Sequence, residues 1–269
     1  MSPTATANDA AYHFAASGIA AIVNFPLWRA SAIAQSGFKL EGSNMFVRYY
    51  KAVMTPPYKG VAATMFGMTW ARGFIFFGSD VAKDAMKAAD VYEPLQHTLG
   101  PLIIGTFVQV VNMPLVRATI TIQDPSCQLP NVRSALVDIY KRKGVSGLWH
   151  GVSAGIMKTV PKYVTAVAVK DYMEEFLPRA ENETKADKML RSGVKSVSAG
   201  LAGAILTNPL DVLRNEMFKT DLSLTQSFKK LMKEEGMAFG ARGIASNMTA
   251  VAIPIAITIF MTDMLMAMK

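Results

Sequence analysis

The segment TNPLDVLRNEMF, Thr207–Phe218, ends an apolar stretch with a proline, an acid two residues after it and a base five residues after it. Related segments lie upstream, NFPLWRASAIAQ from Asn24 and NMPLVRATITIQ from Asn112. A segment that recurs at a steady spacing indicates internal repeats. The prolines of the three Pro-Leu pairs stand 88 and 95 residues apart, at Pro26, Pro114 and Pro209.

Two further markers keep the same register. A glycine follows each proline by 34, 37 and 34 residues, within YKG, WHG and ARG, and an acid stands 20 residues beyond each glycine. The glycines are Gly60, Gly151 and Gly243, and the acids are Asp80, Asp171 and Asp263. Three markers in register predict three repeats, 1–90, 91–182 and 183–269, within one integrated domain.

The composition favours a membrane-embedded domain. The chain of 269 residues is 51% apolar and 18% charged, with a mean hydropathy of +0.23. Three charge-free segments come close to the roughly 20 residues that a spanning helix needs; they are 10–28, 94–116 and 243–262. Prolines lie inside these segments, where neighbouring membrane helices can satisfy the freed carbonyl groups. We therefore expect an integral membrane protein.

Each repeat predicts the same elements. A long apolar helix with small residues runs through the proline, a short basic amphipathic helix follows, and a second long helix starts near the marker glycine. The predicted fold is all-α, with six transmembrane helices and three short surface helices. The connections within repeats, 37–60, 124–150 and 218–243, hold 13 basic and 6 acidic residues, whereas those between repeats, 84–96 and 174–191, hold 5 and 8. The first set is therefore expected to face the more negative compartment.

Several classes of protein are disfavoured. The single cysteine, Cys127, has no partner for an internal disulfide, and the N-terminal sequence has neither a secretory nor a transit-peptide pattern. GVSAG, Gly151–Gly155, matches a hydrolase nucleophile motif, but that motif needs a strand before its helix, and here it opens a predicted membrane helix. The placement of the net charge of +8 suits anionic lipid better than nucleic acid. We expect no enzyme activity, no metal and no cofactor.

The repeats, together with PLDVLR, YKG and EEGMAFGARG, resemble the mitochondrial carrier family over essentially the whole chain. This resemblance implies the mitochondrial carrier fold, a six-helix bundle of the inner membrane whose central water-filled cavity opens and closes through rings of salt bridges at its two ends. It also implies that the surface helices face the matrix and that both termini face the intermembrane space.

In this family, the matrix-side ring pairs the acid two residues after one proline with the base five residues after another. Only the third repeat supplies these charges, Asp211 and Arg214. The equivalent positions hold Trp28, Ser31, Val116 and Thr119. We therefore expect no ion pair between repeats at this end, which Trp28 and Val116 can close as an apolar plug instead.

Other gate motifs of the family are also incomplete in this sequence. Gln35 and Gln123 match the glutamines that brace this ring in carriers, and Phe218 replaces the third. At the opposite end the family pattern is an acid with a base three residues later, which Asp80 and Lys83 fit. In the other repeats this pattern is broken, since Asp171 is followed by Glu174 and Asp263 by Met266. At most one good pair is expected there.

Charges inside the predicted spanning helices are candidate substrate contacts, because such charges usually face a cavity. They are Arg72, Lys158 and Lys162, and the resemblance places Lys158 at the central substrate-contact position. If the chain transports a substrate, these bases favour a small anion such as a carboxylate or a phosphate. The alternative is that they extend to the interface, pair with carbonyl groups or contact a partner subunit.

The marker segments match positions that bind cardiolipin as a structural lipid in carriers, and helix N-termini attract phosphate groups. The candidate residues are Lys59, Gly60, Gly151, Arg242 and Gly243. The alternative is simple interfacial anchoring by Tyr58, Trp149 and the neighbouring bases.

Two functions stay open at this point. The reduced gates favour a carrier-derived, non-transporting accessory subunit of a larger inner-membrane complex of the respiratory-chain type. The three bases favour an active, divergent carrier that exchanges a small anionic metabolite.

Overall fold

The computed structural model describes residues 7–39, 42–54, 56–178 and 184–267, and every regular element among them is a helix. The all-α prediction is therefore confirmed. The long helices are α1 (Ala7–Ser36), α3 (Val61–Ala88), α4 (Glu93–Thr121), α6 (Val152–Phe176), α7 (Lys185–Thr220) and α9 (Ile244–Ala267). The shorter ones are α2 (Met45–Met54), α5 (Val132–Leu148), α8 (Leu224–Glu235) and the 3₁₀ helix η1 (Gly236–Ala241).

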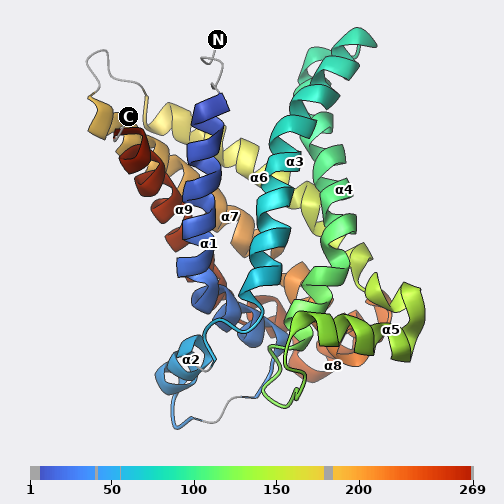
Figure 1. Cartoon of the computed structure of the whole chain (residues 1–269). Coiled ribbons are helices and arrows are strands. Elements are labelled where there is room, and N and C mark those ends of the chain that lie inside the picture. The colour runs from blue at the N-terminus through green and yellow to red at the C-terminus, as the bar shows by residue number, and fades with distance from the viewer. Residues whose placement is uncertain (1–6, 40–41, 55, 179–183, 268–269) are drawn as a thin grey trace.

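The six long helices form a closed ring (Figure 1). Each packs against the next in the order α1, α3, α4, α6, α7 and α9, and α9 packs back along α1. The short helices α2, α5 and α8 lie at one end of this ring, which we call the surface-helix end. The described chain enters α1 and leaves α9 at the opposite end. The order long, short, long thus occurs three times along the chain.

The long helices contain 24 to 36 residues, so each exceeds the roughly 20 residues needed to cross a bilayer. By length and composition, two stretches among the described residues are suited to crossing a membrane: Leu102–Thr121 within α4 and Asp187–Thr220 within α7. Charges reduce the apolar character of other long helices; α6, for example, carries Lys158 and Lys162.

The prolines of the three Pro-Leu pairs lie inside α1, α4 and α7. Proline has no amide hydrogen, so Pro114 leaves the carbonyl of Val110, four residues earlier, without its helical donor. The indole Nε1 of Trp149 donates to that carbonyl oxygen at 3.0 Å. The aromatic residue of the second marker therefore satisfies the carbonyl group that the proline of its own repeat has freed.

The three marker glycines precede α3, α6 and α9 directly, as the sequence predicts. Gly60, Gly151 and Gly243 have φ angles of +92°, +89° and +70°, a left-handed conformation that glycine adopts at no steric cost. Space is also short at two of them. A Cβ on Gly151 would lie 2.5 Å from Cε1 of Phe218, and one on Gly243 would lie 2.8 Å from the backbone nitrogen of Gln35.

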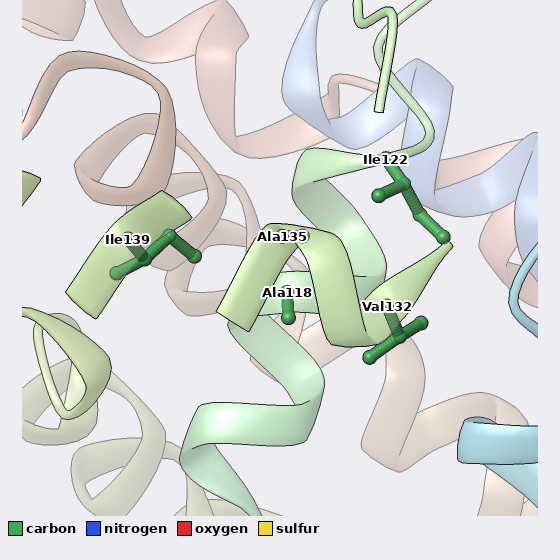
Figure 2. Close-up of a cluster of buried hydrophobic side chains, with 5 residues drawn as sticks. All are labelled: Ala118, Ile122, Val132, Ala135 and Ile139. Atoms are coloured by element: carbon green, nitrogen blue, oxygen red, sulfur yellow. The ribbon is translucent and has the colours of Figure 1, made fainter. Parts of the chain in front are cut away.

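A small apolar cluster fixes α5 to the end of α4 (Figure 2). Ala118 of α4 and Ile122, the residue directly after that helix, face Val132, Ala135 and Ile139 of α5, and all five are buried. Asn131 caps α5 by accepting a hydrogen bond from the amide of Ser134 at 2.9 Å. These contacts hold the connection between α4 and α5 against the surface-helix end of the ring.

Candidate substrate cavity

A cavity of about 560 Å³ lies inside the ring, and all six long helices contribute to its wall. This volume is within the roughly 300–1,000 Å³ usual for small-molecule sites. Small residues make room for it, among them Gly67 of α3, Ala204 of α7 and Ala250 of α9. Trp28 and Val116 lie in its wall near the prolines.

The charged residues that line this cavity, among those described, are Lys158, Lys162, Asp211 and Arg214. Lys158 Nζ lies 2.6 Å from Asp211 Oδ1, and Arg214 Nη2 lies 3.0 Å from the same oxygen. Their side chains are 10% to 17% exposed. Asp211 therefore binds two bases, one on its own helix and one on α6.

The ion pair between Lys158 and Asp211 corrects one prediction. From the sequence, no ion pair between repeats is expected at this end because neither neighbouring Pro-Leu motif offers a partner. The partner comes instead from α6, where Lys158 lies close enough to reach Asp211. The prediction is wrong because it considered only the motif positions of the family ring.

Uncharged polar side chains complete the lining, and they were not among the residues predicted from the sequence. Asn112 accepts a hydrogen bond from Trp70 Nε1 at 2.8 Å and donates to the carbonyl of Gly67 at 3.2 Å. Asn24 donates to the carbonyl of Ala250 at 3.1 Å. Their signal in the sequence was an amide in an otherwise apolar run, as in VNFPL and VNMPL. Some buried polar atoms in the lining have no partner among the described residues; they are Asn24 Oδ1, Gln109 Nε2, Arg214 Nε and Asn215 Nδ2.

Trp28 and Val116, the residues expected to close this end as an apolar plug, pack on the same apolar cluster. Met113, Ile120 and Phe218 form the buried part of this cluster. Phe218, at the position of the missing third glutamine, also lies beneath the guanidinium carbons of two arginines at about 6 Å. These are Arg117 and Arg214.

The two glutamines also lie at this end, with partners other than the ring they resemble. Gln35 Nε2 donates to Asn208 Oδ1 at 2.9 Å and so joins α1 to α7. Gln123 accepts from Arg29 Nε at 2.6 Å and donates to the carbonyl of Lys59 at 2.9 Å. Both glutamines therefore connect different repeats by hydrogen bonds: the partner of Gln35 is the neutral amide of Asn208, and one partner of Gln123 is the charged Arg29.

Two buried arginines that were not predicted as site residues also make contacts at this end. Arg29 and Arg117 each stand three residues after a proline, and each is 3% exposed. Arg117 binds the carboxylate of Asp221 and the carbonyl of Gly147. The shared pattern Pro-Leu-x-Arg in the first two repeats was the available signal.

A buried acid in α7 makes a further set of ion pairs. Glu216 is 2% exposed and lies 2.7 Å from Lys230 Nζ and 3.4 Å from Arg242 Nη2. The hydrogen bond to Glu216 raises the pKa of Lys230. Arg242 Nε also donates to the carbonyl of Gln35 at 2.9 Å, which joins the third repeat to the first.

For the remaining candidate residues, the structure describes the backbone but not the side chain. The backbones of Arg72, Asp80, Lys83, Asp171 and Asp263 are helical, but their side chains lie outside the described residues. Glu174, three residues after Asp171, pairs with Arg191 and Lys195 of α7. Ion pairs therefore join α6 to α7 at the end of the ring opposite the surface-helix end.

Two of the residues predicted to bind lipid, Lys59 and Arg242, also form hydrogen bonds or ion pairs within the chain. Lys59 Nζ donates to the carbonyl of Cys127 at 3.4 Å. Arg242 binds Glu216, Glu235 and the carbonyl of Gln35. Both bases contribute to packing within the chain.

Known proteins share this sequence pattern. A family model described as mitochondrial carrier protein matches residues 90–181 and 185–269. The chain is 26% identical over 188 residues to the mitochondrial thiamine pyrophosphate carrier 1 of Lodderomyces elongisporus, with 63% of this chain and 59% of that protein covered. It is 22% identical over 217 residues to the mitochondrial basic amino acids transporter of Mus musculus, covering 76% and 69%.

A third relative is the mitochondrial pyrimidine nucleotide transporter of Saccharomyces cerevisiae, 24% identical over 234 residues, with 76% of this chain and 62% of that protein covered. The match therefore spans roughly three fifths to two thirds of these relatives' own lengths. They are named as carriers or transporters, not as enzymes or accessory subunits. With a family model over both its later repeats, this chain belongs to the mitochondrial carrier family.

Proposed function

We propose that this protein is an active carrier of the mitochondrial inner membrane that exchanges a small anion, a carboxylate or phosphate compound, through the cavity between its six long helices. The observation that carries this proposal is the charge of the cavity. Three bases and one acid line it among the described residues, which gives a net charge of +2. Such a surface raises the local concentration of anions.

The relatives' names agree with an anion only in part. Two of those named above carry phosphate-bearing compounds, a pyrophosphate and nucleotides, and one carries basic amino acids. Among the described lining residues, a cation would have to approach Lys158, Lys162 and Arg214 with Asp211 as the single acid to attract it. We therefore favour an anionic substrate.

The ion pair in the cavity suggests how binding is coupled to opening. An anion that binds Lys158 and Arg214 competes with Asp211 for the same two bases. Displacement of Asp211 removes a connection between α6 and α7. A ligand shifts a conformational equilibrium only through its different affinity for the two states. Here the anion would bind more tightly to the state in which Asp211 has released the two bases.

The proposed arrangement in the membrane follows the family. All six long helices would span the bilayer, with repeats 1–90, 91–182 and 183–269 and the surface-helix end in the matrix. Because the described chain enters α1 and leaves α9 at the other end, both termini would face the intermembrane space. Cardiolipin at the marker segments stays part of this proposal, with the backbone amides after Gly60, Gly151 and Gly243 as the phosphate donors.

An accessory subunit is the weaker proposal. Its main argument was the absence of any ion pair between repeats at the surface-helix end, and Arg117–Asp221 and Lys158–Asp211 now stand against that argument. The relatives' names favour transport as well.

The test is uptake of radiolabelled anions by liposomes that contain the purified chain. Inorganic phosphate, citrate and a pyrimidine nucleotide are compared with arginine as the cationic alternative. We expect uptake of at least one anion and its reduction by about 10- to 100-fold in Lys158→Gln, since one hydrogen bond to a charged group contributes about 1.5–3 kcal/mol. Lys229→Gln, an exposed lysine of α8 outside the cavity, is the matched control.

Three results would oppose the proposal. Uptake of arginine alone would reverse the sign of the substrate. An equal loss in both variants would remove the cavity from the mechanism. A folded, lipid-reconstituted chain that transports none of these solutes, yet migrates in native gels only within a large complex of fixed composition, would support the accessory subunit instead.

A further inference from the structure

A second cavity, of about 830 Å³, lies at the surface-helix end and shares no lining residue with the first. It is bounded by the end of α1, by α2, by the segment before α3, by residues 122–127 and by the end of α7. Among the described residues its charged lining consists of five bases and one acid. These are Arg29, Lys39, Lys51, Lys59, Lys219 and Asp124. We call this cavity the basic pocket.

Arg29 is the buried member of this set. It is 3% exposed, its Nε binds Gln123 and its Nη1 binds the carbonyl of Ala52 at 2.6 Å. Its Nη2 makes no hydrogen bond to a described residue, and no carboxylate in the described part of the chain pairs with it. A buried guanidinium without a negative partner is costly, so this charge calls for a counterion.

In the second repeat, the arginine at the equivalent position has a carboxylate counterion within the chain. Arg117 stands at the same position after its proline, is equally buried, and binds a carbonyl of its own short helix, Gly147, just as Arg29 binds Ala52. The difference is the acid, since Arg117 also binds Asp221, which stands 12 residues after the proline of the next repeat.

In the repeat that follows Arg29, the position 12 residues after the proline is Ser126. Ser126 lines the basic pocket. The pseudo-symmetry therefore places a serine where Arg117 has its carboxylate. Asp124 makes no ion pair with Arg29 in the described part of the chain; its Oδ1 instead accepts from the amide and hydroxyl of Ser126 at 2.8 and 2.7 Å.

We propose that the basic pocket binds an anionic oxygen group, a phosphate or a carboxylate, which takes the place at Arg29 that Asp221 takes at Arg117. Lys51, Lys59 and Lys219 come from α2, from the segment before α3 and from the end of α7, so the ligand contacts charges of the first and third repeats beside Ser126 of the second. Its binding stabilises the state in which this end is closed. The proposal does not depend on which substrate binds the cavity inside the ring, which we call the inner cavity.

The chain supplies its own reporter for this site. Cys127 is the single cysteine, is partly buried and lines the basic pocket. The purified full chain in detergent is treated with a negatively charged thiol reagent, with and without inorganic pyrophosphate. We expect pyrophosphate at ten times its dissociation constant to slow the modification by about tenfold. Sodium chloride at the same ionic strength should slow it much less.

Two variants test the location. Lys51→Gln/Lys59→Gln/Lys219→Gln should lose the protection, whereas Lys141→Gln/Lys229→Gln/Lys233→Gln, with three exposed lysines outside the pocket, should keep it. Ser126→Asp supplies the missing carboxylate. It should raise the melting temperature without pyrophosphate and abolish the further rise that pyrophosphate gives to the unmodified chain.

The source of the anion is read from the same assay. Protection by pyrophosphate in lipid-free detergent identifies a soluble ligand, and protection only by phosphatidylglycerol or cardiolipin micelles identifies a lipid headgroup; both support the site. Equal effects of pyrophosphate, anionic lipid and sodium chloride would overturn it, as would a Ser126→Asp variant that melts no higher and keeps its response. Neither result would alter the expectation for uptake through the inner cavity.

Discussion

Lys158 Nζ lies 2.6 Å from Asp211 Oδ1, and this ion pair joins α6 to α7 at the wall of the inner cavity. The two residues come from the second and third predicted repeats. Arg214 Nη2 lies 3.0 Å from the same carboxylate oxygen. The acid of the only complete Pro-Leu motif is therefore bound both within its helix and across to the next one.

Removal of one member of this pair should destabilise the fold more than removal of both. Asp211→Asn leaves Lys158 and Arg214 facing each other without an acid, and breaking one side of a buried pair costs about 3–5 kcal/mol. The double variant Lys158→Met/Asp211→Asn should recover at least about 1 kcal/mol of that loss. The measurement is thermal unfolding of the detergent-solubilised chain for the single and double variants. Strictly additive effects would contradict a direct interaction.

The overall architecture could be predicted because it rests on local patterns. The marker glycines predict the starts of α3, α6 and α9, since a left-handed residue before a helix needs glycine. The short basic runs predict α2, α5 and α8. These features depend on residues close together in the sequence.

The pairing of charges could not be predicted in the same way. Lys158 and Asp211 are separated by 53 residues, and Arg117 and Asp221 by 104. Which helix face meets which depends on the packing of the whole ring. The family motif directed attention to the positions two and five residues after each proline, whereas Arg29 and Arg117 occupy the position three residues after it.

The ion pair between Arg117 and Asp221 should contribute strongly to stability. Asp221 has a left-handed backbone with φ of +57°, and asparagine tolerates that conformation, so Asp221→Asn removes the charge with little backbone strain. We expect a loss of about 2–4 kcal/mol, because buried Arg117 is left without its acid. Asp90→Asn is the matched control, since Asp90 is exposed and has φ of +54°. Equal unfolding curves for the two variants would show that the pair contributes nothing.

Gly151 should be restricted by two separate effects. Its left-handed backbone disfavours alanine by about 1–2 kcal/mol, and the new Cβ would also lie 2.5 Å from Cε1 of Phe218, which adds about 1–3 kcal/mol of overpacking. Gly60→Ala isolates the first effect, because Gly60 has nearly the same backbone as Gly151, with φ of +92° and ψ of 5°, and its Cβ would come no nearer than 3.0 Å to the end of the Ile122 side chain. Gly151→Ala should therefore be the more destabilising variant, and Phe218→Leu in the same chain should recover part of the difference. Equal melting temperatures for the two alanine variants would rule out the steric effect of Phe218.

The hydrogen bond from Trp149 to the carbonyl of Val110 should matter only because Pro114 cannot donate to that carbonyl. Trp149→Phe leaves a partly buried acceptor unsatisfied and should cost about 1 kcal/mol, the low end of the range for a buried acceptor, together with some loss of packing. Pro114→Ala restores an amide four residues after Val110, so Trp149→Phe should cost clearly less in that background. The measurement is a double-mutant cycle on thermal unfolding, in which a coupling of at least about 0.5 kcal/mol exceeds ordinary non-additivity. A coupling near zero would mean that Trp149 acts through packing alone, because the packing loss is the same in both backgrounds.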